Sequence, residues 1–436
     1  MADAMIDLGE VPRQREHLVP ISRSLPLARY RPLLGALSLL LIALLAGAAH
    51  HNPPRAPAVI PGRLSDVTFV DGGRLFVISV GPAQPGRGQL SKIISGYSLP
   101  DAKLLSRTTV VVSGSVSNVL LAGDTMVVSY RVDENGGQAT VAVTVGTSTV
   151  LWRRPVELFA VSAADGIALL GLDNVGGRDA GWSVVDLKTG VARWSMRQPP
   201  VGFSSDVSFP KWFVTATPAG RLEQRDSRTG AITATATVPR SGSGSGSNGG
   251  ELISSVDDLL MVSSGRGELT AYGLPGLVPR WTSEVDLSQS WQQSGCGPVI
   301  CAFRQQAGVT ALDRATGRPL WNSDRWTNVM PIGRYLAATP GDQSGAPPRL
   351  WLLDPATGRV LGNFGPWSGL GGDGESSLRY AMYQENYVVR YGELDPDRLR
   401  VRILGSAKQV SGDCHVSTGA LICRLVDASI GVWRLE

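Results

Sequence analysis

The sequence predicts an all-β fold built from one four-stranded antiparallel unit that repeats along the chain. A turn phrase, ALDRATGRPLW at Ala311–Trp321, carries the repeat, and close copies lie at Val184–Trp194, Glu223–Thr233 and Leu352–Gly362. Two short apolar runs occur before the turn in each period, and no window shows a sustained helical period. Together with the strands on either side of the turn, these runs predict units of four short strands.

The spacing of the turn glycines gives the length of the unit. Gly190, Gly230, Gly276, Gly317 and Gly358 follow one another at intervals of 40, 46, 41 and 41 residues, which is the period of four-stranded propeller blades. A single sheet of this size cannot bury both of its faces, so the units must stack around an axis. We therefore predict a β-propeller, with an all-β sandwich as the alternative.

Each turn has the residue types that a tight reversal needs. The aspartates that open the four clearest turns are Asp186, Asp226, Asp313 and Asp354. An aspartate at this position can accept hydrogen bonds from the backbone ahead of it. The glycine that follows can adopt the positive φ that a short hairpin with a bulge requires.

The phrase A-[LV]-D-x-x-T-G-x-x-x-W resembles the repeat of PQQ-like (quinoprotein-type) β-propellers. In that family the tryptophan after the turn docks between neighbouring blades. The resemblance implies this role for Trp194 and Trp321, which lie four residues after their glycines. In the other units, the nearby or equivalent residues are Trp152, Trp281, Ala234 and Gly362. The resemblance covers about residues 64–436.

The family that this repeat resembles includes quinone-dependent alcohol dehydrogenases. It also includes the non-catalytic propeller lipoprotein of the outer-membrane barrel-assembly machinery. Catalytic members carry adjacent cysteines, with a carboxylate and an asparagine set around Ca²⁺ and the quinone. No two cysteines are adjacent here. The resemblance thus implies a propeller without a cofactor, and a PQQ- or metal-dependent oxidoreductase is the alternative.

The composition argues against a nucleic-acid partner. Charged residues make up 18% of the chain and the net charge is +4, which is too mild for a protein that binds a polyanion. No basic stripe interleaved with aromatic residues is present.

The N-terminal part predicts a membrane anchor. Residues 1–32 predict a disordered cytoplasmic tail, and Leu33–Ala49 is an uncharged run of 17 residues, at the lower limit for a spanning helix. Five arginines precede this run, so the positive-inside rule puts the N-terminus in the cytoplasm and the rest of the chain outside. We predict a transmembrane signal anchor. A cleaved signal peptide is the alternative, because Ala46–Ala48 resembles a cleavage site.

The rest of the chain predicts a stalk followed by the propeller. Residues 50–63 are Pro-rich and extended, and the propeller spans residues 64–436. Eight connected units follow one another, and residues 413–436 form a partial unit without a turn or a fourth strand. We expect residues near 56–63 to pair with the last strand and close the ring. Since propellers typically have about four to eight blades, we predict eight blades, with seven as the alternative.

The four cysteines form two local pairs, Cys296 with Cys301 and Cys414 with Cys423. In each pair, one cysteine lies on the first predicted strand of a unit and the other on the second, which can bring the two Cβ atoms to disulfide distance. The even count and the predicted extracytoplasmic location favour two disulfide bonds. A zinc site would need the two pairs to converge, and they lie in separate units.

Candidate catalytic groups are scarce. His415 is the one histidine beyond the stalk, so a nucleophile activated by histidine would have to use it. No phosphate-binding or dinucleotide-binding motif occurs. We predict no catalytic residue, no metal site and no bound cofactor.

We predict a membrane-tethered, extracytoplasmic and monomeric propeller that binds a protein or a cell-envelope component through one of its faces. The longest polar loops are the candidate contact surfaces, since binding residues concentrate on loops. These loops are Val132–Gln138, Ser241–Gly250, Gly341–Pro348 and Pro366–Ser376.

Overall fold

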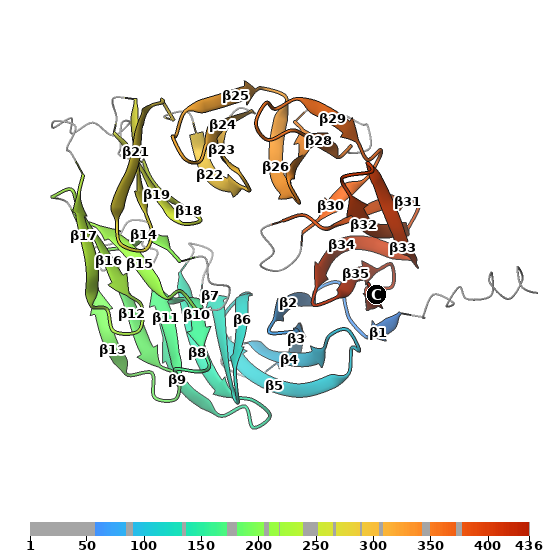
Figure 1. Ribbon diagram of the computed structural model, residues 1–436. Coiled ribbons are helices and arrows are strands. Elements are labelled where there is room, and N and C mark those ends of the chain that lie inside the picture. Colours follow the sequence, from blue (N-terminus) through green and yellow to red (C-terminus); the bar gives the residue numbers. More distant parts are fainter. Residues whose placement is uncertain are drawn as a thin grey trace, which may run out of the picture. The chain divides into compact units, whose positions relative to one another are not determined.

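The computed structural model describes a ring of β-sheets within the compact unit Ala56–Glu436 (Figure 1). The described residues are 57–83, 90–132, 137–171, 181–204, 209–217, 219–238, 252–264, 267–287, 290–304, 308–341, 349–371 and 377–435. They form nine four-stranded antiparallel sheets: eight are meanders whose strands pair in sequence order, and the ninth joins three C-terminal strands to one N-terminal strand. The first strand of each sheet lies nearest the centre of the ring and the fourth lies at its outer edge.

The sheets are called blades one to nine here, in chain order from β2. Blade one contains β2 (Val67–Asp71), β3 (Arg74–Ala83), β4 (Leu90–Ser98) and β5 (Leu104–Val112). Blade two contains β6 (Val116–Ala122), β7 (Thr125–Arg131), β8 (Gln138–Thr144) and β9 (Val150–Arg154). Blade three contains β10 (Glu157–Ser162), β11 (Ile167–Gly171), β12 (Trp182–Asp186) and β13 (Ala192–Met196). Blade four contains β14 (Pro200–Phe203), β15 (Trp212–Ala216), β16 (Arg221–Asp226) and β17 (Ile232–Thr237). Blade five contains β18 (Leu252–Val256), β19 (Leu259–Ser264), β20 (Glu268–Gly273) and β21 (Val278–Glu284). Blade six contains β22 (Ser290–Cys296), β23 (Val299–Arg304), β24 (Val309–Asp313) and β25 (Pro319–Ser323).

Blade seven contains β26 (Trp326–Ile332), β27 (Tyr335–Pro340), β28 (Trp351–Leu353) and β29 (Val360–Asn363). Blade eight contains β30 (Ser368–Leu370), β31 (Tyr380–Glu385), β32 (Val388–Asp395) and β33 (Arg400–Lys408). Blade nine is β34 (Val410–Ser417), β35 (Ala420–Leu425), β36 (Ile430–Arg434) and β1 (Ala58–Ile60).

The prediction of eight blades was wrong, because the described residues form nine. All eight connected units are complete four-stranded blades. The last residues of the chain add three more strands, and β1 supplies the fourth. The usual upper size of propellers misled the count, whereas the strand pattern itself contained nine units.

The ring closes through strands from the two ends of the propeller, as predicted. Ala58 pairs with Val432 and Ile60 with Ile430, in antiparallel register. Arg424 on β35 adds a second connection, since its guanidinium donates hydrogen bonds to the carbonyl oxygens of Arg63 (3.1 Å) and Asp66 (2.6 Å). Residues 58–60 therefore belong to the propeller, although they fall within the predicted stalk.

Apolar side chains hold each blade against the next. In the described part of the chain, buried apolar residues form nine clusters, and each cluster joins one pair of neighbouring blades. At the closing junction, Ile60 and Ile422 of blade nine pack with Leu75 of blade one. Each sheet thus buries both faces between its neighbours, so the ring is stabilised by hydrophobic burial at every junction.

The predicted tail and membrane segment, residues 1–32 and 33–49, lie outside the described residues. Within the described ranges, no helix has the length and apolar character needed to cross a membrane.

Candidate functional site

The turn between the third and fourth strands is the local structure on which the repeat depends. In blade three, the Asp186 Oδ1 atom accepts hydrogen bonds from the backbone N–H groups of Lys188 (3.1 Å) and Thr189 (3.0 Å). It also accepts one from the Thr189 hydroxyl. These bonds lower the pKa of Asp186, the bond from the Thr189 backbone contributing most. The same arrangement occurs at Asp226, Asp313 and Asp354.

Four of these turns are covered by a tryptophan from the preceding blade. Each indole N–H donates to the carbonyl oxygen of the residue after the turn aspartate. The pairs are Trp152 to Leu187 (2.7 Å), Trp194 to Ser227 (3.1 Å), Trp281 to Arg314 (2.9 Å) and Trp321 to Pro355 (2.8 Å). The ring of each tryptophan lies against the turn glycine, so that a Cβ at Gly358 would lie 2.6 Å from Trp321.

At two junctions the positions of the large and the small residue are exchanged: the turn carries a leucine, and the docking position of the preceding blade carries glycine or alanine. Gly362 stands where a docking tryptophan would be, and the side chain of Leu399, in the next turn, lies against it. Leu399 occupies the position of the turn glycine, with a φ of 50°. In blade five, Leu277 (φ 55°) takes that position and Ala234 of blade four takes the docking position. The bulk at these junctions therefore comes from the turn.

The prediction of Gly276 as a turn glycine is off by one residue. Gly273 ends β20 as Asp186 ends β12, so the residue equivalent to Gly190 is Leu277. The backbone N–H of Gly276 instead donates to the Gln224 side chain of blade four (2.7 Å).

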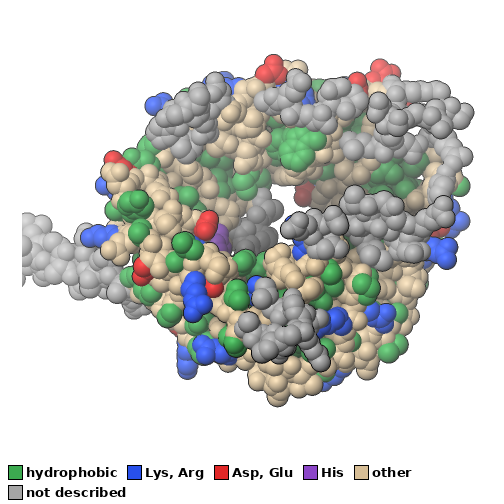
Figure 2. All heavy atoms as spheres, turned by 180° about the vertical axis from the view of Figure 1, so that it is seen from behind, with side chains coloured by type: hydrophobic (Ala, Val, Ile, Leu, Met, Phe, Trp, Pro, Cys, Tyr) green, Lys and Arg blue, Asp and Glu red, His purple; other side chains and the backbone are tan. Residues whose placement is uncertain are grey.

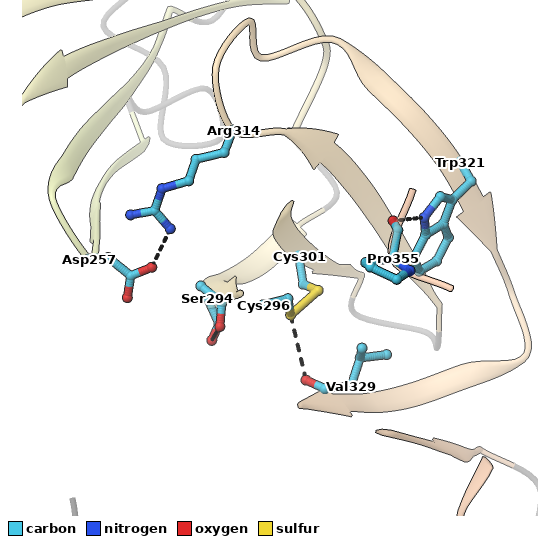
Figure 3. The surroundings of a disulfide bond; sticks show 9 residues. Asp257, Ser294, Cys296, Cys301, Arg314, Trp321, Val329 and Pro355 are labelled. Atoms are coloured by element: carbon cyan, nitrogen blue, oxygen red, sulfur yellow. Dashed lines mark hydrogen bonds and ion pairs between the residues drawn. A yellow bond between two sulfur atoms is a disulfide. The ribbon is translucent and has the colours of Figure 1, made fainter. Parts of the chain in front are cut away.

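Both predicted disulfide bonds are present, each within the first hairpin of one blade. Cys296 and Cys301 lie in blade six and are fully buried, and Cys414 and Cys423 lie in blade nine. Neither pair is directly opposite in register. Cys301 pairs with Ser294 across the hairpin, and Cys414 lies where the register of β34 shifts, between the pairs Gly412–Arg424 and His415–Ile422. Figure 3 shows the first disulfide beside the docked Trp321.

A groove lies at the end of blades four, five and six that carries these turns. It has a volume of about 550 Å³. Its lining comes from the first and third turns of blade five, the first loop of blade four and the third turn of blade six. The lining residues are Ser204, Lys211, Trp212, Asp257, Asp258, Leu274, Pro275 and Arg314. Segments more than 100 residues apart, from Ser204 to Arg314, thus meet in one site.

Arg314 organises the charged side of the groove. Its guanidinium donates to Asp257 (2.6 Å), as Figure 3 shows, and also to Asp258, so one arginine of blade six bridges two carboxylates of blade five. Partial burial lowers the pKa of Arg314, but the two carboxylates outweigh it and raise that pKa overall. The backbone carbonyl of Arg314 accepts the Trp281 indole N–H, which fixes this turn on blade five.

The groove suits a polypeptide. Trp212, Leu274 and Pro275 provide apolar surface, while two basic and two acidic side chains balance in charge around them. Figure 2 shows Lys and Arg side chains interspersed with Asp and Glu around the ring on the face drawn, without a single basic patch. Mixed apolar and polar surfaces with an arginine and an aromatic side chain are typical of protein-binding sites.

The residues of this structure do not fit the quinone site of catalytic propellers. The cysteines form two separate disulfides, each joining two strands of one blade. Among the residues that the structure describes, no group of three or more His, Cys, Asp or Glu side chains is arranged to hold a metal ion. His415 lies on β34, paired with Ile422. We therefore assign no redox role to any residue.

The candidate contact loops from the sequence and the groove are different surfaces. Val132 and Gly341, the first residues of two of these loops, directly follow the second strands β7 and β27, so both lie at the other end of the ring. Residues 133–136, 241–250, 342–348 and 372–376 lie outside the described residues, and the described part of Pro366–Ser376 contains β30. The groove was missed because Arg314 and its partner Asp257 are 57 positions apart. Only the double acid Asp257–Asp258 at a turn gave a local signal.

Comparison with known proteins identifies the repeat. Residues 62–323, more than half of the chain, match the family model described as outer membrane protein assembly factor BamB. None of the curated proteins compared with the chain matches it.

Two solved structures illustrate the likeness. The chain is similar to BamB from Moraxella catarrhalis, with 13% identity over 73% of this chain and 96% of that one, at a TM-score of 0.37. It is also similar to a eukaryotic initiation factor, with 13% identity over 78% of this chain and 91% of that one, at a TM-score of 0.51. The second likeness supports the propeller fold alone.

Proposed function

The chain belongs to the PQQ-like β-propeller family described as outer membrane protein assembly factor BamB, and from this premise we propose that it is a non-catalytic protein-binding scaffold. The groove of blades four to six is the proposed binding site. The family match supports the proposal because the family is described as an assembly factor.

The single observation that carries this proposal is the composition of the groove. Half-buried Trp212, the first residue of β15, lines the groove together with Arg314, which lies in the third turn of blade six and has a side chain that is 28% exposed. A partner segment that covered the groove would bury Trp212 and Pro275 and would exchange water for contacts with the charged rim. Preformed sites of this kind bind with little loss of conformational freedom.

Photo-cross-linking from the groove tests the proposal. A photoreactive amino acid at Lys211, an exposed groove position, is expected to give one discrete adduct with a second protein in cells. The same amino acid at Val132, which is exposed at the other end of the ring, is the control. The charge reversal Asp258→Lys should remove the Lys211 adduct without changing the unfolding midpoint by more than a few degrees.

Equal adducts from Lys211 and Val132, or a Lys211 adduct that survives Asp258→Lys, would contradict the groove as the binding site. A discrete adduct from Val132 alone would assign binding to the opposite end of the ring.

We also propose that the propeller is tethered on the extracytoplasmic side of a membrane by Leu33–Ala49. The uncharged run and the five arginines before it support this proposal. The full chain is expected to stay with membranes after alkaline extraction, and its propeller should be digested by protease added to the outer side of that membrane. A Leu40→Arg, Ile42→Arg variant should be lost from the membrane fraction. Wild-type chain released by alkali would contradict the anchor.

A further inference from the structure

The outer strand of blade four differs from the outer strands of the other blades. β17 has the sequence ITATAT over Ile232–Thr237 and contains no charge, proline or glycine. Its exposed residues alternate with half-buried ones along most of its length, so the strand is regular and its outer edge faces solvent. Within the described residues, no hydrogen bond links this edge to another element.

The other outer strands carry features that discourage pairing with a further strand. Exposed arginines lie on β5, β9, β13, β21 and β33, namely Arg107, Arg153, Arg193, Arg280 and Arg402. Proline lies in β21 and β25, β29 has four residues with a glycine, and β1 has three. Charges, prolines and short lengths are the means by which proteins protect sheet edges from strand addition. β17 has none of them.

The charges beside β17 indicate what kind of strand fits. Thr235 and Thr237 are in register with Glu223 and Arg221 of β16. Glu223 is nearly buried and is bound by both Arg221 (3.3 Å) and Arg225 (2.5 Å), which leaves this group of three with a net positive charge. The Arg221 side chain is 52% exposed. An acidic residue on an added strand would therefore meet Arg221 near the end of β17.

We propose that β17 is a site of β-strand addition for an extended segment of a partner protein. The segment is uncharged except for one acidic residue beside Thr237, the register partner of Arg221. Backbone hydrogen bonds to the free edge give the affinity, and cross-strand contacts with Ile232 and the threonines give the register. This surface is separate from the groove, so the proposal does not depend on the groove binding a protein.

A strand-forming peptide tests the proposal on the full chain in mild detergent. The probe is a fluorescent decapeptide of alternating Thr and Val with one Asp near its end. Binding is expected to slow amide exchange in Ile232–Thr237. Thr235→Lys should weaken binding at least about tenfold, which is the effect of about 1.4 kcal/mol. The matched control is Ser195→Lys on β13, a strand that already carries an arginine, and it should leave the affinity unchanged.

Two further comparisons separate the explanations. A peptide methylated on alternate backbone nitrogens should lose binding, because strand addition needs those N–H groups, and Asp258→Lys in the groove should have no effect. Slowed exchange outside β17, or equal affinity of the Thr235→Lys and wild-type proteins, would overturn the proposal. A dimer of the wild-type protein that Thr235→Lys dissociates in sedimentation would make a second copy the occupant and would likewise overturn it.

Discussion

At the scale of the residue, the contact between a tryptophan and a turn glycine explains the repeat phrase. The aspartate fixes the turn through its Oδ1 atom, and the glycine provides both a positive φ and room for an indole ring. Gly358 has a φ of 67° and lies against Trp321. The positive φ and the contact with the indole ring both restrict this residue to glycine. Comparison with a glycine that has a positive φ but no such contact separates the two effects.

Gly358→Ala should therefore destabilise the propeller more than Gly123→Ala does. A Cβ at Gly123 has no atom within 4 Å, although its φ of 64° is nearly the same. Gly123→Ala should cost about 1 kcal/mol for the left-handed backbone. Gly358→Ala should cost roughly 1–3 kcal/mol more, because the alanine Cβ forces Trp321 to move. Urea unfolding of the two variants measures the difference, and equal losses would show that the tryptophan contact is unimportant.

At the scale of the element, six of the described junctions between blades are filled by one bulky side chain at the third turn, which either blade can supply. Trp321 of blade six supplies this side chain at the junction with blade seven. Leu399 of blade eight supplies it at the next junction, where Gly362 of blade seven leaves room for the leucine. A left-handed leucine is costly by itself, at about 1 kcal/mol, and its packing against the preceding blade compensates for that cost.

The pair Gly362 and Leu399 should behave as a coupled unit. Gly362→Trp alone should overpack the junction and lower stability by roughly 1–3 kcal/mol. Leu399→Gly alone should remove the packing while relieving the backbone. The double variant restores the arrangement of the other junctions and should be more stable than the sum of the single changes predicts, by about 0.5–3 kcal/mol. Additive effects in thermal unfolding would mean that the two residues do not complement each other.

The sequence predicted those elements whose information is local. The spacing from Gly190 to Gly230 and the aspartates before them revealed the four-stranded unit and its turn. It did not reveal that Leu277 replaces a turn glycine, because the neighbouring Gly276 obscures this replacement. The groove was beyond reach for a similar reason, since its residues approach one another only when blades four to six stack.

At the scale of the whole molecule, the ring depends on joining its two ends. β1 and Arg424 make this connection, while the exposed ion pair of Arg434 with Asp101 lies at the same junction. The blade number also belongs to this scale. The sequence indicated that a strand near residues 56–63 completes the last unit, but the usual upper size of propellers held the predicted count at eight.

Arg424→Met should loosen the closing junction strongly. It removes a nearly buried side chain, 11% exposed, and takes the guanidinium donor from the carbonyl oxygen of Asp66, while that of Arg63 keeps only the backbone N–H of Asp66. The expected loss of stability is roughly 3 kcal/mol. Arg434→Met at the same junction removes an exposed pair and should cost under about 1 kcal/mol. Similar unfolding midpoints for the two variants would mean that Arg424 does not hold the ring closed.

Hydrogen exchange of the complex tests the central claim, that the groove of blades four to six binds a protein. The full chain is compared alone and saturated with the protein cross-linked from Lys211. Slowed amide exchange at the turns containing Asp257, Leu274 and Arg314 is the expected result. Protection confined to the opposite end of the ring, around Val132, would contradict it.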